Sequence, residues 1–149
     1  MKVEKYPKIY LYRRIVQAKL FIDSNYANAL DLDNVAGEAS FSKFHFIRLF
    51  KKIYGQTPHQ YLTSVRIEQA KLLLQTQMAV AEVCFSVGFD SISSFTGLFK
   101  RLTAVTPSLY QKLQWRRKEE IHKMPLRFIP NCFAENNGWT KNRNFQEVI

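Results

Sequence analysis

The sequence predicts an all-α protein of about seven helices, in which two similar units are joined by one long helix. Three observations support this: a repeated segment, apolar residues at helical spacing, and turn residues that begin and end helices. The segment at residues 40–61 (SFSKFHFIRLFKKIYGQTPHQY) recurs from Phe89 onward as FDSISSFTGLFKRLTAVTPSLY, and paired residues such as Phe50 and Phe99 lie 49 positions apart. Because only two copies are present, a tandem pair is favoured over a solenoid.

The first predicted helix spans residues 9–25, after a short charged lead-in that contains Pro7. Its apolar residues recur at helical spacing. We expect this helix to pack against the first unit and to read no bases. The apolar residues are Leu11, Ile15, Ala18, Phe21 and Ile22.

A short helix and a longer basic helix are predicted next. The short one spans residues 31–39 (DLDNVAGEA) with Asp31 as its N-cap, and residues 39–41 form a tight turn. The longer one spans residues 42–53, and one of its faces is expected to lie in the core. Helix, turn and longer basic helix form the pattern of a helix-turn-helix DNA reader. The expected core residues are Phe46, Leu49, Phe50 and Ile53.

The opposite face of the helix at residues 42–53 is the first candidate DNA-binding surface. A purely solvated face rarely needs Phe44 and Ile47, although single exposed apolar residues are common. Arg48 can form a bidentate bond to guanine, and the two apolar side chains can contact thymine methyl groups. The candidate DNA-binding residues of this unit are Ser42, Lys43, Phe44, His45, Ile47, Arg48, Lys51 and Lys52.

A long linker helix is predicted between the two units. Gly55 ends the preceding helix, and Thr57 and Pro58 are typical of an N-cap and a first helical position. The helix is expected to run to about Gln75 and, at 1.5 Å per residue, to span about 27 Å. It would therefore set the spacing of the two reading helices. Its expected apolar positions are Tyr61, Leu62, Val65, Ile67, Ala70, Leu72, Leu73 and Leu74.

The second unit is predicted to repeat the first. Its supporting helix spans residues 78–87, and the turn follows at Gly88, where a left-handed backbone costs least. Asp90 or Ser91 caps the second recognition helix, at residues 91–103. A last helix is expected to begin at Thr106-Pro107 and to end near Glu120. The core face of the recognition helix is expected to contain Phe95, Leu98, Phe99 and Leu102.

The outward face of the second recognition helix is less selective than that of the first. Serine and threonine can bond bases or phosphates with little discrimination, and Gly97 stands where the first copy has Arg48. We therefore expect the first unit to carry most of the sequence specificity and the second unit to contribute more positioning. The candidate DNA-binding residues here are Ser91, Ser93, Ser94, Thr96, Gly97 and Lys100.

One turn departs from the repeat. Ala104 stands where the first copy has Gly55. Alanine raises the cost of a positive φ by about 1 kcal/mol, so the second turn is expected to differ in shape or to be less stable.

These spaced residues resemble the DNA-binding domain of the AraC/XylS family of bacterial transcription regulators, from about Arg13 to Gln114. Departures are Gly97, where relatives often carry a reading side chain, and Ala104, where the family usually has glycine; Cys84 is a small residue where the family usually has alanine. The matching residues are Val83, Cys84, Gly88-Phe89-Asp90, Ser94-Phe95, Phe99-Lys100-Arg101, Thr106-Pro107 and Tyr110, with Arg66, Ala70, Leu73 and Leu74 in the linker.

The resemblance implies a partner and a mode of action. The partner is double-stranded DNA, entered by both recognition helices in successive major grooves. Because few residues precede the first helix, the chain resembles the stand-alone members of the family, which bind as monomers and activate transcription by recruiting RNA polymerase. The expected organisation is a first helix-turn-helix subdomain at residues 1–57, a linker helix at 58–75, a second subdomain at 76–120 and a C-terminal extension at 121–149.

The C-terminal extension is predicted to be irregular and aromatic, because its apolar residues show no helical or strand period. We expect Phe128, Phe133 and Trp139 to fold back over an apolar patch of the domain. Two alternatives are a docking surface, for RNA polymerase or a second copy of the chain, and a small-ligand pocket. Prolines and an Asn-Asn-Gly segment separate the apolar residues, which are Phe128, Ile129, Phe133, Trp139 and Phe145.

Composition limits the function classes. The net charge is +10, of which +7 falls within residues 1–115, so an anionic partner is favoured over a charge that serves solubility alone. The histidines are isolated, and no metal-ligand spacing, phosphate loop or nucleophile motif occurs, so we expect no catalytic residues, no metal and no cofactor. Two cysteines make no disulfide framework and no membrane segment is expected, which favours the cytoplasm and the nucleoid.

Two other functions stay open. The first is an architectural protein that bends DNA with little sequence choice, which predicts a small affinity ratio between specific and random sites. The second is a protein-interaction module that uses Phe44 and Ile47, which predicts a weak dependence on salt.

Overall fold

The computed structural model describes residues 9–32 and 42–137, and within these ranges the chain forms helices and no strands. The prediction of an all-α fold is therefore confirmed. The predicted short helix and turn at residues 31–41 lie outside the described residues from 33 onward. The helices are α1 (Ile9–Asn25), α3 (Lys43–Tyr54), α4 (Pro58–Leu73), α5 (Val80–Ser86), α6 (Ile92–Thr103), α7 (Pro107–Lys123), the 3-10 helix η1 (Pro125–Phe128) and α8 (Asn131–Asn136).

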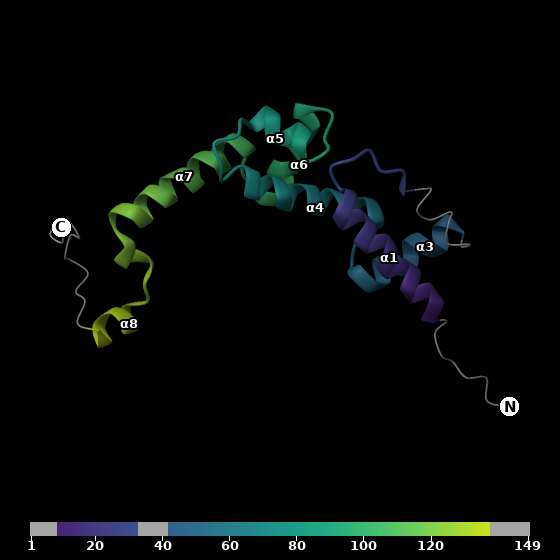
Figure 1. Ribbon diagram of the computed structural model, residues 1–149, viewed down its shortest axis with the longest axis horizontal. Coiled ribbons are helices and arrows are strands. Elements are labelled where there is room, and N and C mark those ends of the chain that lie inside the picture. The colour runs from purple at the N-terminus through teal and green to yellow at the C-terminus, as the bar shows by residue number, and fades with distance from the viewer. Residues whose placement is uncertain (1–8, 33–41, 138–149) are drawn as a thin grey trace.

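The linker helix α4 lies between two groups of helices. Figure 1 shows α1 and α3 at one end of α4, α5 and α6 towards the other end, and α7 leading away to α8. Contacts between elements agree with this view, because α4 packs against α1 and α3 and also against α5, while α6 packs against α7. The helix predicted to join the two units thus touches both of them.

The first hydrophobic cluster joins α1, α3 and the first half of α4. The ring of Phe50 lies 4.8 Å from that of Tyr54 and 5.7 Å from that of Tyr61, measured between centroids. The Tyr61 hydroxyl also donates a 2.8 Å hydrogen bond to Oδ1 of Asp23, which ties α4 to α1. The buried members are Ile15, Ala18, Ile22, Phe46, Phe50 and Leu62.

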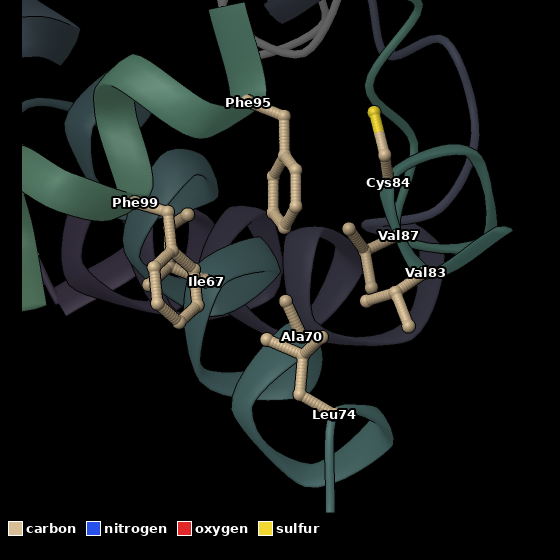
Figure 2. Close-up of a cluster of buried hydrophobic side chains, with 8 residues drawn as sticks. All are labelled: Ile67, Ala70, Leu74, Val83, Cys84, Val87, Phe95 and Phe99. Carbon is tan, nitrogen blue, oxygen red and sulfur yellow. The ribbon is translucent and has the colours of Figure 1, made fainter. Parts of the chain in front are cut away.

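The second hydrophobic cluster joins the second half of α4 to α5 and α6. Figure 2 shows its side chains gathered between these elements, with Phe95 and Phe99 entering from α6. Tyr110 of α7 packs edge-on against Phe99 at 5.5 Å, as Tyr61 packs against Phe50 in the first unit. The buried members are Ile67, Ala70, Leu74, Val83, Cys84, Val87, Phe95 and Phe99.

α4 serves both clusters because its two halves present different buried residues. Leu62 near its start belongs to the first cluster, while the buried residues of its second half, Ile67 and Ala70, belong with Leu74 to the second. The α1 residues Ile15, Ala18 and Ile22 have the same spacing as Ile67, Ala70 and Leu74. The second half of α4 therefore supplies buried side chains to the second cluster in the same pattern in which α1 supplies them to the first cluster.

The helix ends follow the predicted turn residues. The Thr57 side chain accepts a hydrogen bond from the Gln60 backbone, and the Gln60 side chain bonds the Thr57 backbone in return, which completes a capping box. Thr106 caps α7 in the same way, without the return bond. The N-cap of α6 is Ser91 and not Asp90, because the Ser91 hydroxyl accepts from the Ser94 backbone N–H.

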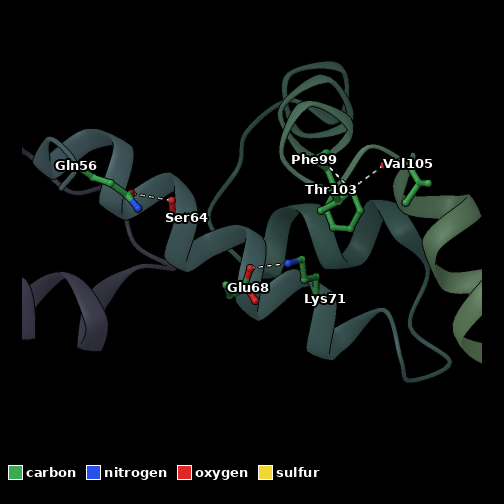
Figure 3. A network of polar contacts seen from close by, with 7 residues as sticks. All are labelled: Gln56, Ser64, Glu68, Lys71, Phe99, Thr103 and Val105. Carbon is green, nitrogen blue, oxygen red and sulfur yellow. Dashed lines mark hydrogen bonds and ion pairs between the residues drawn. The ribbon is translucent and has the colours of Figure 1, made fainter. Parts of the chain in front are cut away.

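The turns that end α3 and α6 have the same shape. Gly55 has φ 74 and ψ −6, and Ala104 has φ 68 and ψ −5. Of the two expected outcomes, a difference in shape is therefore excluded, because alanine here adopts the left-handed conformation, and a lower stability stays a prediction. The Thr103 hydroxyl lies across this turn, 2.8 Å from the carbonyl oxygen of Phe99 and 3.0 Å from that of Val105, and its single proton can be donated to either one (Figure 3).

Several predicted boundaries and core positions need correction. α4 ends at Leu73 and not near Gln75, α5 occupies only Val80–Ser86 of the predicted residues 78–87, and α7 continues to Lys123 beyond the predicted end near Glu120. The predicted core residues Ile53 and Leu102 are 38% and 50% exposed, since each lies in the last turn of its helix, at the edge of its cluster. Leu72 is also exposed.

The C-terminal extension is more regular than expected. The prolines do not break structure there, because Pro125 begins η1 and Pro130 precedes α8. Phe128 contacts α7, where the Arg117 guanidinium lies 6.0 Å from its ring centroid, and neither Phe128 nor Phe133 joins the two clusters. Phe128 and Phe133 are 41% and 53% exposed, so for them the predicted fold-back over an apolar patch of the domain is not borne out beyond the contact of Phe128 with α7. Trp139 lies outside the described residues.

Candidate nucleic-acid interface

α3 presents a basic surface on the side away from the first cluster. Phe46 and Phe50, four residues apart, fill the core and so direct Arg48 outward. Phe44 is 75% exposed, an unusual position for a phenylalanine side chain. Within Lys43–Tyr54 there are four lysine or arginine residues and no acidic residue. The exposed candidate residues are Ser42, Lys43, Phe44, His45, Arg48, Lys51 and Lys52.

Ile47 differs from the other candidates on α3. It is half-buried and packs against the first cluster, although the sequence predicted that it faces outward. The reason is its place on the helix, because Ile47 and Leu49 border opposite edges of the stripe formed by Phe46 and Phe50. Ile47 thus supports the helix on the core, and only part of its side chain is available for contact.

Ser42 contributes to the helix end as well as to the surface. Its hydroxyl accepts a 3.3 Å hydrogen bond from the backbone N–H of His45 and so acts as the N-cap of α3. The side chain of His45 is exposed beside it. The first turn of α3 therefore combines a capped N-terminus with exposed donors, which is the arrangement that suits a phosphate group.

α6 presents a smaller and less charged surface. Ser93, Ser94, Gly97 and Lys100 are exposed, whereas Thr96 is half-buried at the position equivalent to Ile47. A methyl group added at Gly97 would meet no atom within 4 Å, so this position is an open surface in the structure. Ser91 is half-buried and serves as the N-cap.

Arg101 was not among the predicted residues and belongs to the same region. It is exposed in the last turn of α6, directly after Lys100. The signal was available in the sequence, since the two cations are adjacent. α6 then carries two cations against four on α3, and neither helix carries an acid.

Arg66 of α4 also has a role that the sequence did not reveal beyond its resemblance to the family pattern. Its guanidinium donates hydrogen bonds to the carbonyl oxygens of Tyr26 at 2.7 Å and Asn28 at 2.9 Å. Partial burial lowers the pKa of Arg66, and the nearby charge of Asp90 opposes that shift. A contact between side chain and backbone over this sequence distance leaves no trace in a spacing pattern.

Within residues 9–32 and 42–137, no group of three histidine, cysteine or acidic side chains is placed to hold a metal ion. Over the same residues, no helix combines the length and the apolar character needed to cross a bilayer. Cys84 is fully buried, and that burial raises the pKa of its thiol, whereas Cys132 is exposed.

Comparison with known proteins agrees with this geometry. A family model described as a helix-turn-helix domain matches residues 35–113, more than half of the chain. The Transposon Tn10 TetD protein of Escherichia coli is 38% identical over 104 residues, which cover 69% of this chain and 75% of that protein. The HTH-type transcriptional activator AarP of Providencia stuartii is 36% identical over 98 residues, 65% of this chain and 73% of that one.

Solved structures give the same result. The DNA-binding domain of the global transcriptional factor AdpA, in complex with a target DNA, aligns with a TM-score of 0.67 and 26% identity over 72% of this chain and 97% of that chain. The C-terminal domain of AraT, a response regulator from Geobacillus stearothermophilus, aligns with a TM-score of 0.63 and 27% identity over 67% and 84%.

The fold, the two basic helices and the family match define a DNA-binding transcriptional regulator of the helix-turn-helix type. The family match and the identity to TetD and AarP are specific enough to assign it further. The chain belongs to the AraC family of transcription regulators.

Proposed function

We propose that this protein binds specific sites in double-stranded DNA by inserting α3 and α6 into successive major grooves, and that it activates transcription from those sites. The observation that carries the proposal is the outward face of α3, a helix without acidic residues. On this face Arg48 is exposed, opposite the buried Phe46 and Phe50, and Phe44 is 75% exposed. A face that only needs to be hydrated rarely exposes a phenylalanine to this extent, four residues before an exposed arginine.

The two helices take different roles in this proposal. Arg48 bonds a guanine edge through both of its terminal nitrogens, and Phe44 contacts a thymine methyl group. Ser93 and Lys100 of α6 contact phosphates and weakly selective base edges, and Gly97 leaves that helix without a long reading side chain at its centre. Most of the specificity therefore lies in α3, and α6 fixes the register of the protein on the duplex.

Activation follows by analogy with AarP, a relative named as a transcriptional activator. A single chain with two different reading faces suits an asymmetric site, and we propose that it binds there as a monomer and recruits RNA polymerase. It acts on chromosomal DNA through binding and not through catalysis.

The first test is selection of bound duplexes from a random library, followed by titration of the selected site and of random DNA at two salt concentrations. One strongly defined segment with a weaker one about 10 base pairs away supports the proposal. Steep salt dependence is expected because phosphate neutralisation releases counterions.

Arg48→Ala tests the role of α3. It should cost about 1–3 kcal/mol of binding free energy, and the loss should be confined to one base pair of the selected site. Arg48→Lys keeps the charge but lacks the bidentate fork, so it should retain affinity for random DNA and lose the base preference. Arg116→Ala, on the exposed side of α7, is the matched control for a lost charge. Equal losses on selected and random DNA after Arg48→Ala would contradict the assignment.

A second function is favoured by the bare face of α6, where hydroxyl groups surround the open position of Gly97. Such a face suits an architectural protein that bends DNA with little sequence choice. The same selection decides between the two functions. Steep salt dependence without an enriched sequence indicates the architectural protein, and absence of DNA binding points instead to a protein partner for the exposed Phe44.

A further inference from the structure

The loop that follows α1 is held between the linker helix and the second unit. Arg66 of α4 binds this loop through two hydrogen bonds. Its Nε donates to the Tyr26 carbonyl oxygen at 2.7 Å, and a terminal nitrogen donates to the Asn28 carbonyl oxygen at 2.9 Å. Two donors from one planar group fix both the position and the orientation of the loop. A residue of α4 thus holds a segment that lies some forty positions earlier in the chain.

The second unit also approaches this loop closely. Gly88, in the turn after α5, has φ 92, and a Cβ built there would lie 2.8 Å from the carbonyl oxygens of both Tyr26 and Ala27. Real Cβ atoms do not come this close to carbonyl oxygens. Glycine at this position therefore permits both the turn and the close approach of the two backbones.

Side chains complete the contact. The Arg66 guanidinium lies 5.6 Å from the ring centroid of Phe89, the residue after Gly88, so one arginine touches the loop and the second unit together. Tyr26 packs against both hydrophobic clusters. The first and second units are therefore connected through this loop as well as through α4.

We propose that Arg66, Gly88 and the loop at residues 26–28 form a joint that fixes the two helix-turn-helix units at one mutual orientation, and that this joint sets the spacing between sub-sites that the protein accepts on DNA. α4 alone keeps the units at a distance of about 24 Å, its 16 residues at 1.5 Å each, but a single helix does not prevent a terminal unit from tilting on its end. Arg66 is a positioning residue, because it acts through the loop and through Phe89.

The spacing consequence rests on the proposed function, since it requires a two-part DNA site. One inserted base pair shifts the second sub-site by about 3.4 Å and rotates it by about 34°. Two recognition helices held at one fixed orientation cannot both bind after that change, whereas two loosely joined helix-turn-helix units can reorient and bind both sub-sites. Arg66 therefore contributes to specificity without contacting DNA.

The joint can be tested without DNA by measuring the distance between the two units. Spin labels are placed at Gln17→Cys on α1 and Lys112→Cys on α7, both exposed, in a Cys132→Ser background where the buried Cys84 is not labelled. One narrow distance distribution is expected for this parent protein. Arg66→Met and Gly88→Ala should each broaden it or add a second distance. An unchanged distribution in both variants, with folding confirmed by thermal unfolding, overturns the proposal.

Two control variants separate the joint from simpler causes. Gly55→Ala places alanine at φ 74 with no atom within 4 Å, so it has the backbone strain of Gly88→Ala without the collision, and it should leave the distance distribution narrow. Arg116→Met removes the same charge as Arg66→Met at an exposed position of α7. Broadening in Gly55→Ala equal to that in Gly88→Ala would mean that strain, and not the joint, is responsible.

The same variants are then titrated on the selected site with zero, one or two base pairs inserted between its sub-sites. The wild type should lose about tenfold in affinity for one inserted base pair, and Arg66→Met only about twofold, since a loose pair of readers follows the displaced sub-site. The affinity for DNA that carries only the first sub-site should differ by no more than about twofold between the wild type and Arg66→Met. The proposal is overturned if the wild type and Arg66→Met show the same preference for spacing. It is also overturned if Arg66→Met weakens binding to the first sub-site alone as much as it weakens binding to the two-part site. Failure of the wild type to select any two-part site refutes the proposed function instead, and the spin-label distances still decide on the joint.

Discussion

Replacing Ala104 with glycine should stabilise the protein. Ala104 is a non-glycine residue held at positive φ, with φ 68 and ψ −5. Its backbone N–H donates to the Lys100 carbonyl oxygen at 2.8 Å, just as Gly55 donates to the Lys51 carbonyl oxygen at 2.8 Å in the first unit. The turn is therefore the same, and only the cost of adopting it differs.

The magnitude follows from two opposing effects. The left-handed conformation costs an alanine about 1–2 kcal/mol, because its Cβ approaches the following carbonyl oxygen. Glycine loses more conformational freedom on folding, which offsets about 0.4–1 kcal/mol of that gain. Ala104 is exposed, so removing its methyl group leaves no cavity. At the middle of these two ranges, Ala104→Gly should raise the free energy of unfolding by about 0.8 kcal/mol and the Tm by about 2–3 °C.

Urea and thermal unfolding, followed by circular dichroism, measure this difference in stability. The control is the reverse substitution at the equivalent position of the first unit, Gly55→Ala. That substitution introduces alanine at φ 74 in open space and should destabilise the protein by a similar amount. If Ala104→Gly leaves stability unchanged or lowers it while Gly55→Ala destabilises, the reasoning is refuted. A hydrogen bond from the Thr103 hydroxyl across the second turn would then offset the cost of the positive φ at Ala104.

The other predictions concern side chains away from the DNA-binding faces. Burial, and next the hydrogen bond to Asp23, raise the pKa of Tyr61. The folded state therefore holds the Tyr61 proton more tightly than the unfolded chain does. The stability that this proton contributes is present below about pH 10 and is lost as the pH rises through the raised pKa. Tyr61→Phe should cost about 1 kcal/mol in urea unfolding at pH 7 and should weaken the loss of stability above about pH 10, and an unchanged alkaline profile would contradict this. Thiol labelling of the native protein should modify Cys132 at once and Cys84 only on unfolding, because burial raises the pKa of Cys84 and closes access to it; rapid loss of two thiols would contradict the described core.

The sequence predicted the elements that local rules determine. Thr57 and Pro58 marked the start of α4, and Gly55 the end of α3, because a side-chain acceptor, a fixed φ and a free positive φ are properties of single residues. The repeat paired Phe50 with Phe99 and Tyr61 with Tyr110, and the structure adds that each phenylalanine meets its tyrosine edge-on, a contact that no rule of spacing gives. Errors arose at helix ends, where Ile53 and Leu102 have the correct period but lie at the edge of a cluster.

The candidate DNA-binding surface divides in the same way. Exposure of Arg48 and Phe44 follows from helical period alone, since each lies opposite the core phenylalanines. Ile47 lies at the edge of the core stripe, where period alone leaves the burial of a side chain undecided, and the packing of α3 against α1 and α4 makes it half-buried. Period gives the direction of a side chain, and packing decides how much of it remains available.

The joint at Arg66 could not be predicted from the repeat, and the reason bears on how the protein works. Its acceptors are backbone carbonyls, which every residue carries, and they lie 40 and 38 positions from the arginine. The repeat describes two alike units, yet the joint is unlike on its two sides, because the first unit supplies the loop and the second supplies Gly88. The features shared by the two copies therefore account for the fold of each reader, while the features they do not share decide how one reader is set against the other.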